Sequence, residues 1–468
     1  MADDSRPREL AGAVLVVGGG IAGMQASLDL AESGFKVYLV ETKSAIGGHM
    51  AQLDKTFPTN DCAMCNISPK LVEVGRHLNI EILTDTEVVK VDGLAGNFTA
   101  TLRRKPRYID VSKCTGCGEC AQVCPVVIVG RFDEGMVQQR AAFKLYPQAI
   151  PNAYAIEKKG LAPCRDACPT GQRAQGYIAL VREGRYHDAL RVIKEDNPFP
   201  GICGRICNHR CEDACNRGRL DEPVNIRALK RFVTDKVYAE PRRPVESLPV
   251  KYDRRVAIIG AGPCGLTAAQ DLVKMGYPVT VFEALPVAGG MLRVGVPAYR
   301  LPTSIIEREV ADIVEQGVDL RLNSPVTNLD DLFKQSFEAV LIAVGAHEGI
   351  RLPIPGADLP GVHTNTVFLR DVRLGHPPEL GERVVVIGAG DVAMDCARTA
   401  VRLGKQVHIH YRRSRAEAPA DPEEIEHSEE EGIEFHWLSN PVEIVGDGNG
   451  QVGGVKLVRP EMGCRVCG

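Results

Sequence analysis

The 468-residue chain lacks a hydrophobic run long enough to cross a membrane. A spanning helix needs roughly 18 consecutive apolar residues, and the polar, charged start of the chain is unlike a secretory signal. The chain also lacks a strong excess of charge of one sign, because its formal net charge is −4. This balance favours neither nucleic acid nor an anionic membrane surface as a partner. We therefore expect a soluble, cytoplasmic protein with no nucleic-acid partner and no membrane span.

No Ser-His-Asp set and no pair of carboxylates stands out, so the sequence singles out no catalytic side chain. Cysteine, by contrast, is plentiful, with 16 in the chain. The cysteines cluster at short spacings, so in a reducing compartment we interpret them as metal ligands rather than disulfides. With 468 residues the chain is too long for one hydrophobic core. About three to five domains would suit this length.

The stretch from residue 255 to 292 predicts a strand, a glycine turn, a helix, a second strand and an acid. Gly260 makes the tight turn, Gly262 lets the backbone approach a pyrophosphate, and Gly265 lets the helix pack on the strand. Free N–H groups at the start of the helix then face the phosphate charge. Glu283, which ends the second strand, is placed to accept hydrogen bonds from ribose hydroxyls. This order of elements indicates a dinucleotide site.

The same unit occurs at the N-terminus with the same spacing from glycine to acid. A Gly-Gly pair follows each acid at one fixed distance. This second pair resembles that of the flavoproteins with two dinucleotide-binding domains, in which it passes close to FAD. The resemblance implies two FAD half-sites. Their predicted residues are Gly18, Gly20, Gly23, Glu41, Gly47 and Gly48 in the first, and Gly260, Gly262, Gly265, Glu283, Gly289 and Gly290 in the second.

A third copy of the unit begins at Gly388 and Gly390, with alanine in the position of the third glycine. Where the other copies carry an acid, this one carries Arg412 and Arg413 directly after Tyr411. A carboxylate would repel a ribose 2′-phosphate, whereas guanidinium groups pair with it. The third site is therefore predicted to bind NADPH. The alternative is a pair of solvated arginines at the end of a strand.

Residues 114–125 contain the most specific motif, the ferredoxin run C-x2-C-x2-C-x3-C-P. Cysteines at this spacing surround one face of a [4Fe–4S] cube, and in two-cluster ferredoxins the fourth cysteine serves the other cluster. A zinc site is the weaker alternative, because the C-x2-C-x2-C triplet crowds a tetrahedral ion. The predicted ligands are Cys114, Cys117, Cys120 and Cys124.

Residues 49–54, 57–65 and 68–72 resemble the corresponding region of the heterodisulfide reductase A-type flavoproteins. In that family this region joins the FAD fold to iron–sulfur centres. Cys62 and Cys65 form a C-x2-C pair in it, and they are candidate ligands or, alternatively, two buried thiols. Either one of them completes the first cluster or Cys124 folds back onto it.

A second cysteine block covers residues 164–215, with three residues between Cys164 and Cys168 and again between successive cysteines from Cys203 to Cys215. Thiols four apart share a helix face, which suits cluster ligation from one turn. The block and the two following nucleotide units resemble dihydropyrimidine dehydrogenase and the small subunit of NADPH-dependent glutamate synthase, a resemblance that implies two [4Fe–4S] clusters. The predicted ligands are Cys164, Cys168, Cys203, Cys207, Cys211 and Cys215.

Two departures from that family reduce the expectation to one cluster in this block. The family has a further C-x2-C just before the position of Cys164, and residues 157–160 are Glu-Lys-Lys-Gly here. It also has Glu or Gln as a ligand near the position of Lys230, and a protonated lysine does not ligate. Cys464 and Cys467 could start another site, while Cys264, Cys396, His49 and His410 are interpreted as structural residues.

The expected fold class is α/β and multi-domain, with Rossmann-like FAD- and NAD(P)-binding domains, a ferredoxin-like [4Fe–4S] segment and an α-helical [4Fe–4S] domain. Both flavin units lack the returning FAD segment, so we expect a fragment or a chain that other polypeptides complete. The predicted domains are 1–105, a partial FAD-binding domain of the heterodisulfide reductase A type; 106–150, the ferredoxin-type segment; 151–245, the helical iron–sulfur domain; 246–380, FAD-binding; and 381–468, an incomplete NADPH-binding domain.

These features predict an oxidoreductase that passes electrons between NADPH, FAD and [4Fe–4S] clusters. The expected partners are other subunits of a redox complex, a ferredoxin or a disulfide-reducing protein, with bifurcation between two flavins as a further expectation. One alternative is the electron donor of glutamate synthesis, which requires a glutamine-hydrolysing partner. The other is a non-catalytic iron–sulfur subunit in which the flavin domains bind no FAD.

Overall fold

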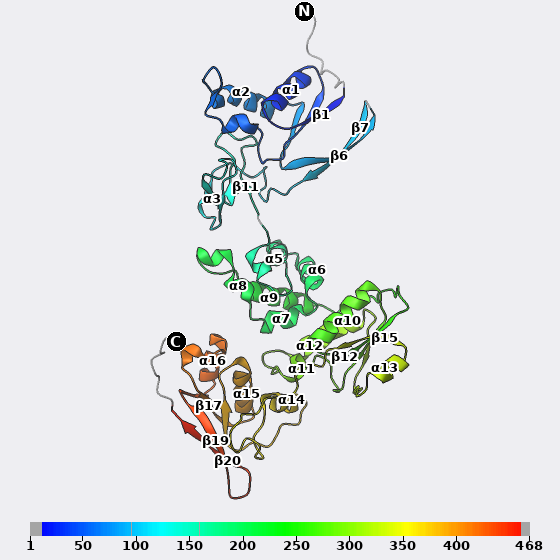
Figure 1. Ribbon diagram of the computed structural model, residues 1–468, viewed down its shortest axis with the longest axis vertical. Coiled ribbons are helices and arrows are strands. Elements are labelled where there is room, and N and C mark those ends of the chain that lie inside the picture. Colours follow the sequence, from blue (N-terminus) through cyan, green and yellow to red (C-terminus); the bar gives the residue numbers. More distant parts are fainter. Residues whose placement is uncertain (1–11, 95, 159, 460–468) are drawn as a thin grey trace, which may run out of the picture. The chain divides into compact units, whose positions relative to one another are not determined.

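The computed structural model describes residues 12–94, 96–158 and 160–459 (Figure 1). The chain forms two compact units, of which one takes in residues up to 167 together with 210–224, and the other 168–209 together with 225 onward. Helices and strands alternate in both, which confirms the predicted multi-domain α/β class. Among the described residues, no helix combines the length and the hydrophobicity needed to cross a bilayer.

The first unit begins with a parallel sheet in the order β1 (Ala13–Val17), β2 (Lys36–Val40) and β5 (Ile80–Leu83). Helix α1 (Ile21–Glu32) connects the first two strands, as expected for parallel neighbours, which need a crossover. It packs on α2 (Ala63–Arg76). Buried side chains of the helices and strands form one core, which includes Met24, Leu39, Ile67 and Leu71.

Small elements fill the rest of this region. They are the 3₁₀ helix η1 (Gly48–Gln52), the hairpin of β3 (Lys55–Thr56) and β4 (Asp61–Cys62), and the hairpin of β6 (Thr86–Leu94) and β7 (Asn97–Arg104).

The ferredoxin-type segment has short elements and long connections. They are α3 (Glu119–Gln122), the antiparallel pair β8 (Val127–Val129) and β9 (Gln138–Arg140), and the pair β10 (Ala142–Phe143) and β11 (Ala155–Ile156). Tyr146, from the connection after β10, is buried in the core of the N-terminal sheet. The segment is therefore packed against the first nucleotide unit. Helices α4 (Pro163–Asp166) and α8 (Arg210–Asp213) contact each other, and η2 (Asn216–Arg219) follows α8.

The second unit begins with a group of helices. They are α5 (Ala174–Arg182), α6 (Tyr186–Asp196), α7 (Pro200–Ile206) and α9 (Ile226–Tyr238). Helix α7 packs closely on α9 at Gly204, where a side-chain Cβ would lie 2.9 Å from the backbone of Arg231. Glycine at this position allows the two helices to approach each other.

A four-stranded parallel sheet follows in the order β14 (Asp319–Arg321), β13 (Val279–Phe282), β12 (Arg255–Ile259) and β15 (Phe337–Ile342). Helices α10 (Pro263–Met275) and α12 (Thr303–Val314) pack against each other and share a core with the sheet (Figure 1). The short helices α11 (Met291–Val294) and α13 (Asp330–Lys334) complete this part.

The C-terminal part repeats the pattern with three parallel strands, β16 (Arg383–Ile387), β17 (Gln406–Tyr411) and β18 (Glu434–Trp437). Its helices are α14 (Asn365–Arg373), α15 (Asp391–Arg402), the 3₁₀ helix η3 (Arg415–Glu417) and α16 (Pro422–Glu430). The antiparallel pair β19 (Asn440–Gly446) and β20 (Val452–Val458) follows, with β19 next to β17. Three βαβ units are therefore present, and each contains one of the predicted glycine turns.

Candidate cofactor and cluster sites

The N-terminal glycine turn is held by a buried carboxylate. Gly18 N donates to Val40 O at 2.8 Å, which joins the turn to the end of β2. The Glu41 side chain accepts a hydrogen bond from Gly19 N and another from Lys43 N, both at 2.8 Å. Glu41 therefore fixes the turn that the sequence assigned to FAD.

The second FAD-type turn has the same network. Gly260 N donates to Phe282 O at 2.7 Å. The buried Glu283 carboxylate accepts from Ala261 N at 2.7 Å and from Leu285 N at 2.9 Å. A carboxylate offers about four acceptor positions, so these two contacts leave capacity for ribose hydroxyls. The ribose contact itself stays a prediction.

The second and third glycines of each turn have different roles. A Cβ on Gly23 would lie 1.9 Å from Gly18 O, and one on Gly265 would lie 2.0 Å from Gly260 O. A Cβ on Gly20 would meet no atom within 4 Å, and one on Gly262 would meet only Gly290 Cα, at 3.8 Å. The third glycine thus allows helix and strand to pack. The second glycine faces open space, as the predicted pyrophosphate contact requires.

The Gly-Gly pairs that follow the acids return to these turns. Gly47 N donates to Gly19 O at 2.7 Å, and Gly289 N donates to Ala261 O at 2.8 Å. The second glycine of each pair has a positive φ, 58° at Gly48 and 54° at Gly290. A Cβ on either would lie within 3.0 Å of the opposing glycine Cα, 2.9 Å for Gly48 and 2.7 Å for Gly290. Both FAD-type units therefore have the same close double-glycine contact, and both fit a dinucleotide.

The third turn has the same backbone but no acid. Gly388 N donates to His410 O at 3.0 Å, which places the turn beside the end of β17. Arg412 and Arg413 follow that strand, and both are exposed. Their side chains form no ion pair or hydrogen bond with any residue that the structure describes. Two uncompensated positive charges therefore lie at the strand end that carries a carboxylate in the other two units.

Three of the ferredoxin-run thiols lie close enough to influence one another. Burial raises the pKa of Cys120, and the neighbouring Cys114 and Cys117 add to this effect. Tyr154 N donates a hydrogen bond to Cys114 Sγ at 3.4 Å. Cys124, after α3, is a free thiol like the other three. The donor set suits a metal cluster.

Cys62 and Cys65 form a disulfide at the start of α2, with Cα atoms 5.3 Å apart. Both residues are exposed, so the alternative of two buried thiols is wrong. In the disulfide form neither sulfur is a thiolate ligand. Ligation by the reduced pair stays a prediction.

The cysteines of the second block do not lie on one helix face. Helix α7 ends at Ile206, and Cys207 at its C-cap is extended, with ψ at 137°. His209 has a φ of 39°, so the chain turns before α8 begins. The expectation of ligation from one helical turn is therefore wrong, since a spacing of four residues predicts a shared face only if the helix continues. Within the first unit, Cys164 and Cys211 lie on the contacting helices α4 and α8.

Within the second unit, Cys168 and Cys203 lie near Lys230, which is only 6% exposed. Burial raises the pKa of Cys203, while Asn197 and Lys230 act in the opposite direction. The pKa of Cys168 is lowered overall. Burial acts to raise it, but hydrogen bonds from Thr170 and from backbone N–H groups, together with the Lys230 charge, lower it by more. Lys230 therefore supplies a positive charge, and no lone pair, among the predicted ligands.

Cys464 and Cys467 lie outside the described residues. Cys396 is buried in the core of the C-terminal sheet, as predicted, whereas Cys264 is exposed and the prediction that it packs is wrong.

Sequence reasoning missed Glu309, a buried carboxylate in α12. It accepts hydrogen bonds from Gly201 N at 2.5 Å and Ile202 N at 3.2 Å, at the start of α7, and from the Tyr238 hydroxyl at 2.9 Å. Burial raises the pKa of Glu309 to about 7, against these hydrogen bonds. The residue joins the FAD-type unit to the helix that carries Cys203. A glutamate in an amphipathic helix gives no sequence signal of such a role.

Sequence reasoning also missed the ion pairs between the FAD-type and NADPH-type units. Arg300 donates to both oxygens of Asp395 in α15, at 2.8 and 2.9 Å, and pairs with Glu424 in α16 at 3.2 Å. The ring of Tyr299 lies under Arg398 and Arg402 of α15. Burial raises the pKa of Asp395 to about 6, although Arg300 lowers it. The segment before α12 thus holds the helix that begins at the third glycine turn.

Four families match parts of this chain. "Pyridine nucleotide-disulphide oxidoreductase" matches residues 254–462, and "FAD dependent oxidoreductase" matches residues 13–113. The 4Fe-4S cluster family of dihydropyrimidine dehydrogenase domain II matches residues 147–241. "4Fe-4S binding domain" matches residues 107–129, which contain the ferredoxin run.

Three relatives show the two halves of the resemblance. The NADP(+)-dependent formate dehydrogenase subunit beta of Moorella thermoacetica is 43% identical over 64% of this chain and 46% of its own length. The glutamate synthase [NADPH] small chain of Escherichia coli strain K12 is 35% identical over 64% of this chain and 67% of its own. An A-type iron-sulfur subunit of the CoB–CoM heterodisulfide reductase of Methanopyrus kandleri is 56% identical over 30% of this chain and 22% of its own. The chain spans about half the length of the first relatives it matches.

Proposed function

Because the chain belongs to the family of the NADPH-dependent glutamate synthase small chain, we propose that it transfers electrons from or to NADPH by way of FAD and [4Fe–4S] clusters. The contrast among the three glycine turns carries this proposal. Two turns hold a buried carboxylate, Glu41 or Glu283, and the third is followed by two exposed arginines. The relatives named as NADP- and NADPH-dependent enzymes support the same nucleotide.

FAD supplies a ring system that accepts a hydride and releases electrons singly. The chain supplies position and charge. Gly262 and Gly290 leave backbone close to the place of the pyrophosphate, and Glu283 orients the turn and offers its remaining acceptor positions to the ribose. Arg412 and Arg413 bind the 2′-phosphate of NADPH and thereby exclude a preference for NADH.

The cysteines would hold the clusters that receive single electrons. Cys114, Cys117, Cys120 and Cys124 would hold one, and the block from Cys164 to Cys215 would hold one more. The partner is another component of a redox complex, a ferredoxin or a disulfide-reducing protein. Relatives that are themselves named as subunits support this. We also propose that the protein is cytoplasmic.

Cofactor content tests the proposal directly. Anaerobically purified protein should contain FAD, iron and acid-labile sulfide, and NADPH should bleach its flavin absorbance. Iron and sulfide without flavin would favour the alternative of an iron–sulfur protein that only conducts electrons. Zinc in place of iron and sulfide would overturn the assignment of the cysteines.

A further inference from the structure

The sheet of β16, β17 and β18 has one polar face. Val407 and Ile409 of β17, with Phe435 and Trp437 of β18, contribute to the apolar core on one side. Alternation along the strands therefore places His408 and His410, with Glu434 and His436, on the other side. The register aligns His408 with Glu434 and His410 with His436. Parallel strands in α/β folds are usually apolar on both faces, so this polar group calls for an explanation.

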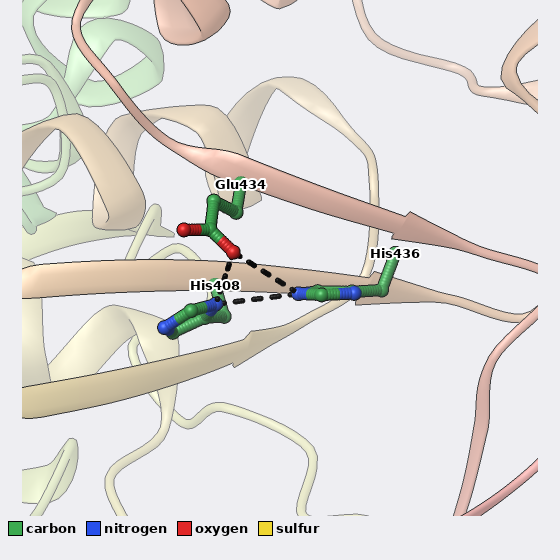
Figure 2. A group of neighbouring side chains, drawn as sticks. All are labelled: His408, Glu434 and His436. Carbon is green, nitrogen blue, oxygen red and sulfur yellow. Dashed lines mark hydrogen bonds and ion pairs between the residues drawn. The ribbon is translucent and has the colours of Figure 1, made fainter.

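Figure 2 shows that His408, Glu434 and His436 point toward one another. His408 Nδ1 lies 3.2 Å from His436 Nε2 and 3.3 Å from Glu434 Oε2. His436 Nε2 lies 3.9 Å from the same carboxylate oxygen. One donor atom from each residue thus forms a triangle, and all three lie within 4.8 Å of one another. Two imidazole nitrogens at 3.2 Å fit either a hydrogen bond, in which one ring donates and the other accepts, or a cation between them.

The dimensions of this triangle match a transition-metal site. With bonds of about 2.0–2.1 Å, the ligands of a tetrahedral zinc ion lie about 3.4 Å apart. The observed separations of 3.2, 3.3 and 3.9 Å lie on either side of that value, so small side-chain movements suffice. Imidazole suits zinc and similar ions, whereas magnesium and calcium prefer oxygen ligands.

We propose that His408, Glu434 and His436 form a binding site for Zn²⁺ that links β17 to β18. His410 supports the site, because its ring stacks on His436 at 4.4 Å with an interplanar angle of 9° and its Nδ1 contacts Ser439 Oγ at 2.9 Å. Glu434 is 58% exposed and His436 is 36% exposed, so the ion can enter from solvent. Three protein ligands leave a fourth position for water or an external ligand. The proposal does not depend on NADPH or FAD chemistry.

Zinc retention by the purified, cluster-loaded chain tests the site. The protein is dialysed against Zn²⁺, the excess is removed, and zinc and iron per chain are measured by mass spectrometry. His408→Gln and Glu434→Gln should each retain about one zinc fewer per chain than the natural sequence, because each removes one of three ligands. His427→Gln and Glu426→Gln are matched controls, since both residues are exposed in α16 of the same domain and lie outside the site. They should retain the natural number.

Iron content shows that each variant still folds with its clusters. Because Glu434 is exposed, its substitution does not disturb the hydrophobic core. The zinc absorption edge provides an independent readout, because zinc–nitrogen bonds of about 2.0–2.1 Å are distinguishable from zinc–sulfur bonds of about 2.3 Å. The zinc that the site variants lose should have nitrogen and oxygen neighbours. The proposal would be overturned if the natural sequence and both site variants retained equal zinc, or if the variants lost only sulfur-bound zinc. The three residues would then be a hydrogen-bonded group.

Discussion

At the scale of single residues, we expect Arg412 and Arg413 to decide which nucleotide the third unit binds. Replacing both with alanine should weaken NADPH far more than NADH, by about 1.5–3 kcal/mol for each lost charge-assisted hydrogen bond. The reason is that only NADPH carries the 2′-phosphate that a guanidinium pairs with. Dissociation constants for both nucleotides, measured by fluorescence or calorimetry, give the ratio.

Arg415→Ala is the control for general loss of positive charge near this strand. Arg415 already pairs with Glu429, so its removal should change both nucleotide affinities little. Equal losses for NADPH and NADH in the double variant would mean that Arg412 and Arg413 do not contact the 2′-phosphate.

Gly262 and Gly265 are separated by two residues but should respond differently to alanine. At Gly265 a Cβ would lie 2.0 Å from Gly260 O, a backbone atom that cannot move freely. Gly265→Ala should therefore lower the free energy of unfolding by about 1–3 kcal/mol, as overpacking does. At Gly262 the φ is −78° and a Cβ meets nothing closer than 3.8 Å. Gly262→Ala should leave the fold intact and weaken FAD binding about tenfold or more, because its methyl group occupies the place of the pyrophosphate.

Thermal unfolding and retained flavin, measured on both variants, separate the two roles. Gly23→Ala and Gly20→Ala provide the same comparison in the N-terminal unit, where the corresponding distances are 1.9 Å and more than 4 Å. If Gly262→Ala kept FAD at the natural affinity, the pyrophosphate would not lie at this turn.

At the scale of elements, Glu309 ties α12 to the start of α7. Its carboxylate has a pKa of about 7 in the folded protein, raised by burial, and an ordinary glutamate pKa in the unfolded chain. The folded state therefore binds the proton of Glu309 more tightly than the unfolded chain does. This tighter binding stabilises the fold fully below about pH 4.3, and the stabilisation is lost as the pH rises toward 7. Each pH unit in this window is worth about 1.4 kcal/mol, and the window spans about 2.7 units, so the loss is up to about 4 kcal/mol.

Glu309→Gln cannot ionise and should not show this loss. The difference in unfolding free energy between the natural sequence and Glu309→Gln should therefore fall by about 2 kcal/mol between pH 5 and pH 7.5. Denaturant unfolding at several pH values measures it. Glu307→Gln, an exposed position in the same helix, should follow the natural pH profile. Parallel profiles for Glu309→Gln and the natural sequence would mean that Glu309 stays ionised in the folded protein.

The βαβ units could be predicted because their signals are local. The glycines, the acids Glu41 and Glu283 and the strand ends lie within short stretches, and the structure brings them together as expected. The continuous helix through Cys207 could not be excluded in this way, because the contact at its end comes from a later segment: Cys207 O accepts a hydrogen bond from Arg227 of α9 at 3.2 Å. The roles of Glu309 and Lys230 could not be predicted either, because they depend on contacts between segments far apart in the chain. The polar face formed by His408 and His436 becomes visible only when the register of β17 and β18 is known.

At the scale of the whole molecule, the chain contains more redox elements than a simple two-electron reductase needs. Two FAD-type units with matching networks and one NADPH-type unit accompany two separate blocks of cysteines. Nicotinamide transfers two electrons together, clusters transfer one, and flavin does both. An assembly with these parts is suited to dividing electron pairs between two acceptors.

Anaerobic titration with NADPH, followed by optical and EPR spectra, tests this division. If the chain takes part in bifurcation, two flavins should reduce at different points of the titration and the clusters should accept electrons at well-separated potentials. The reason is that one electron must reach a low-potential acceptor while the other reaches a high-potential one. Hydrogen bonding, burial and nearby charge set the potentials of the clusters. The buried Lys230 near Cys168 and Cys203 is one such charge, so its cluster should reduce at the higher potential. Reduction of one flavin only, with all clusters at one common potential, would contradict bifurcation and leave a linear transfer between NADPH and the clusters.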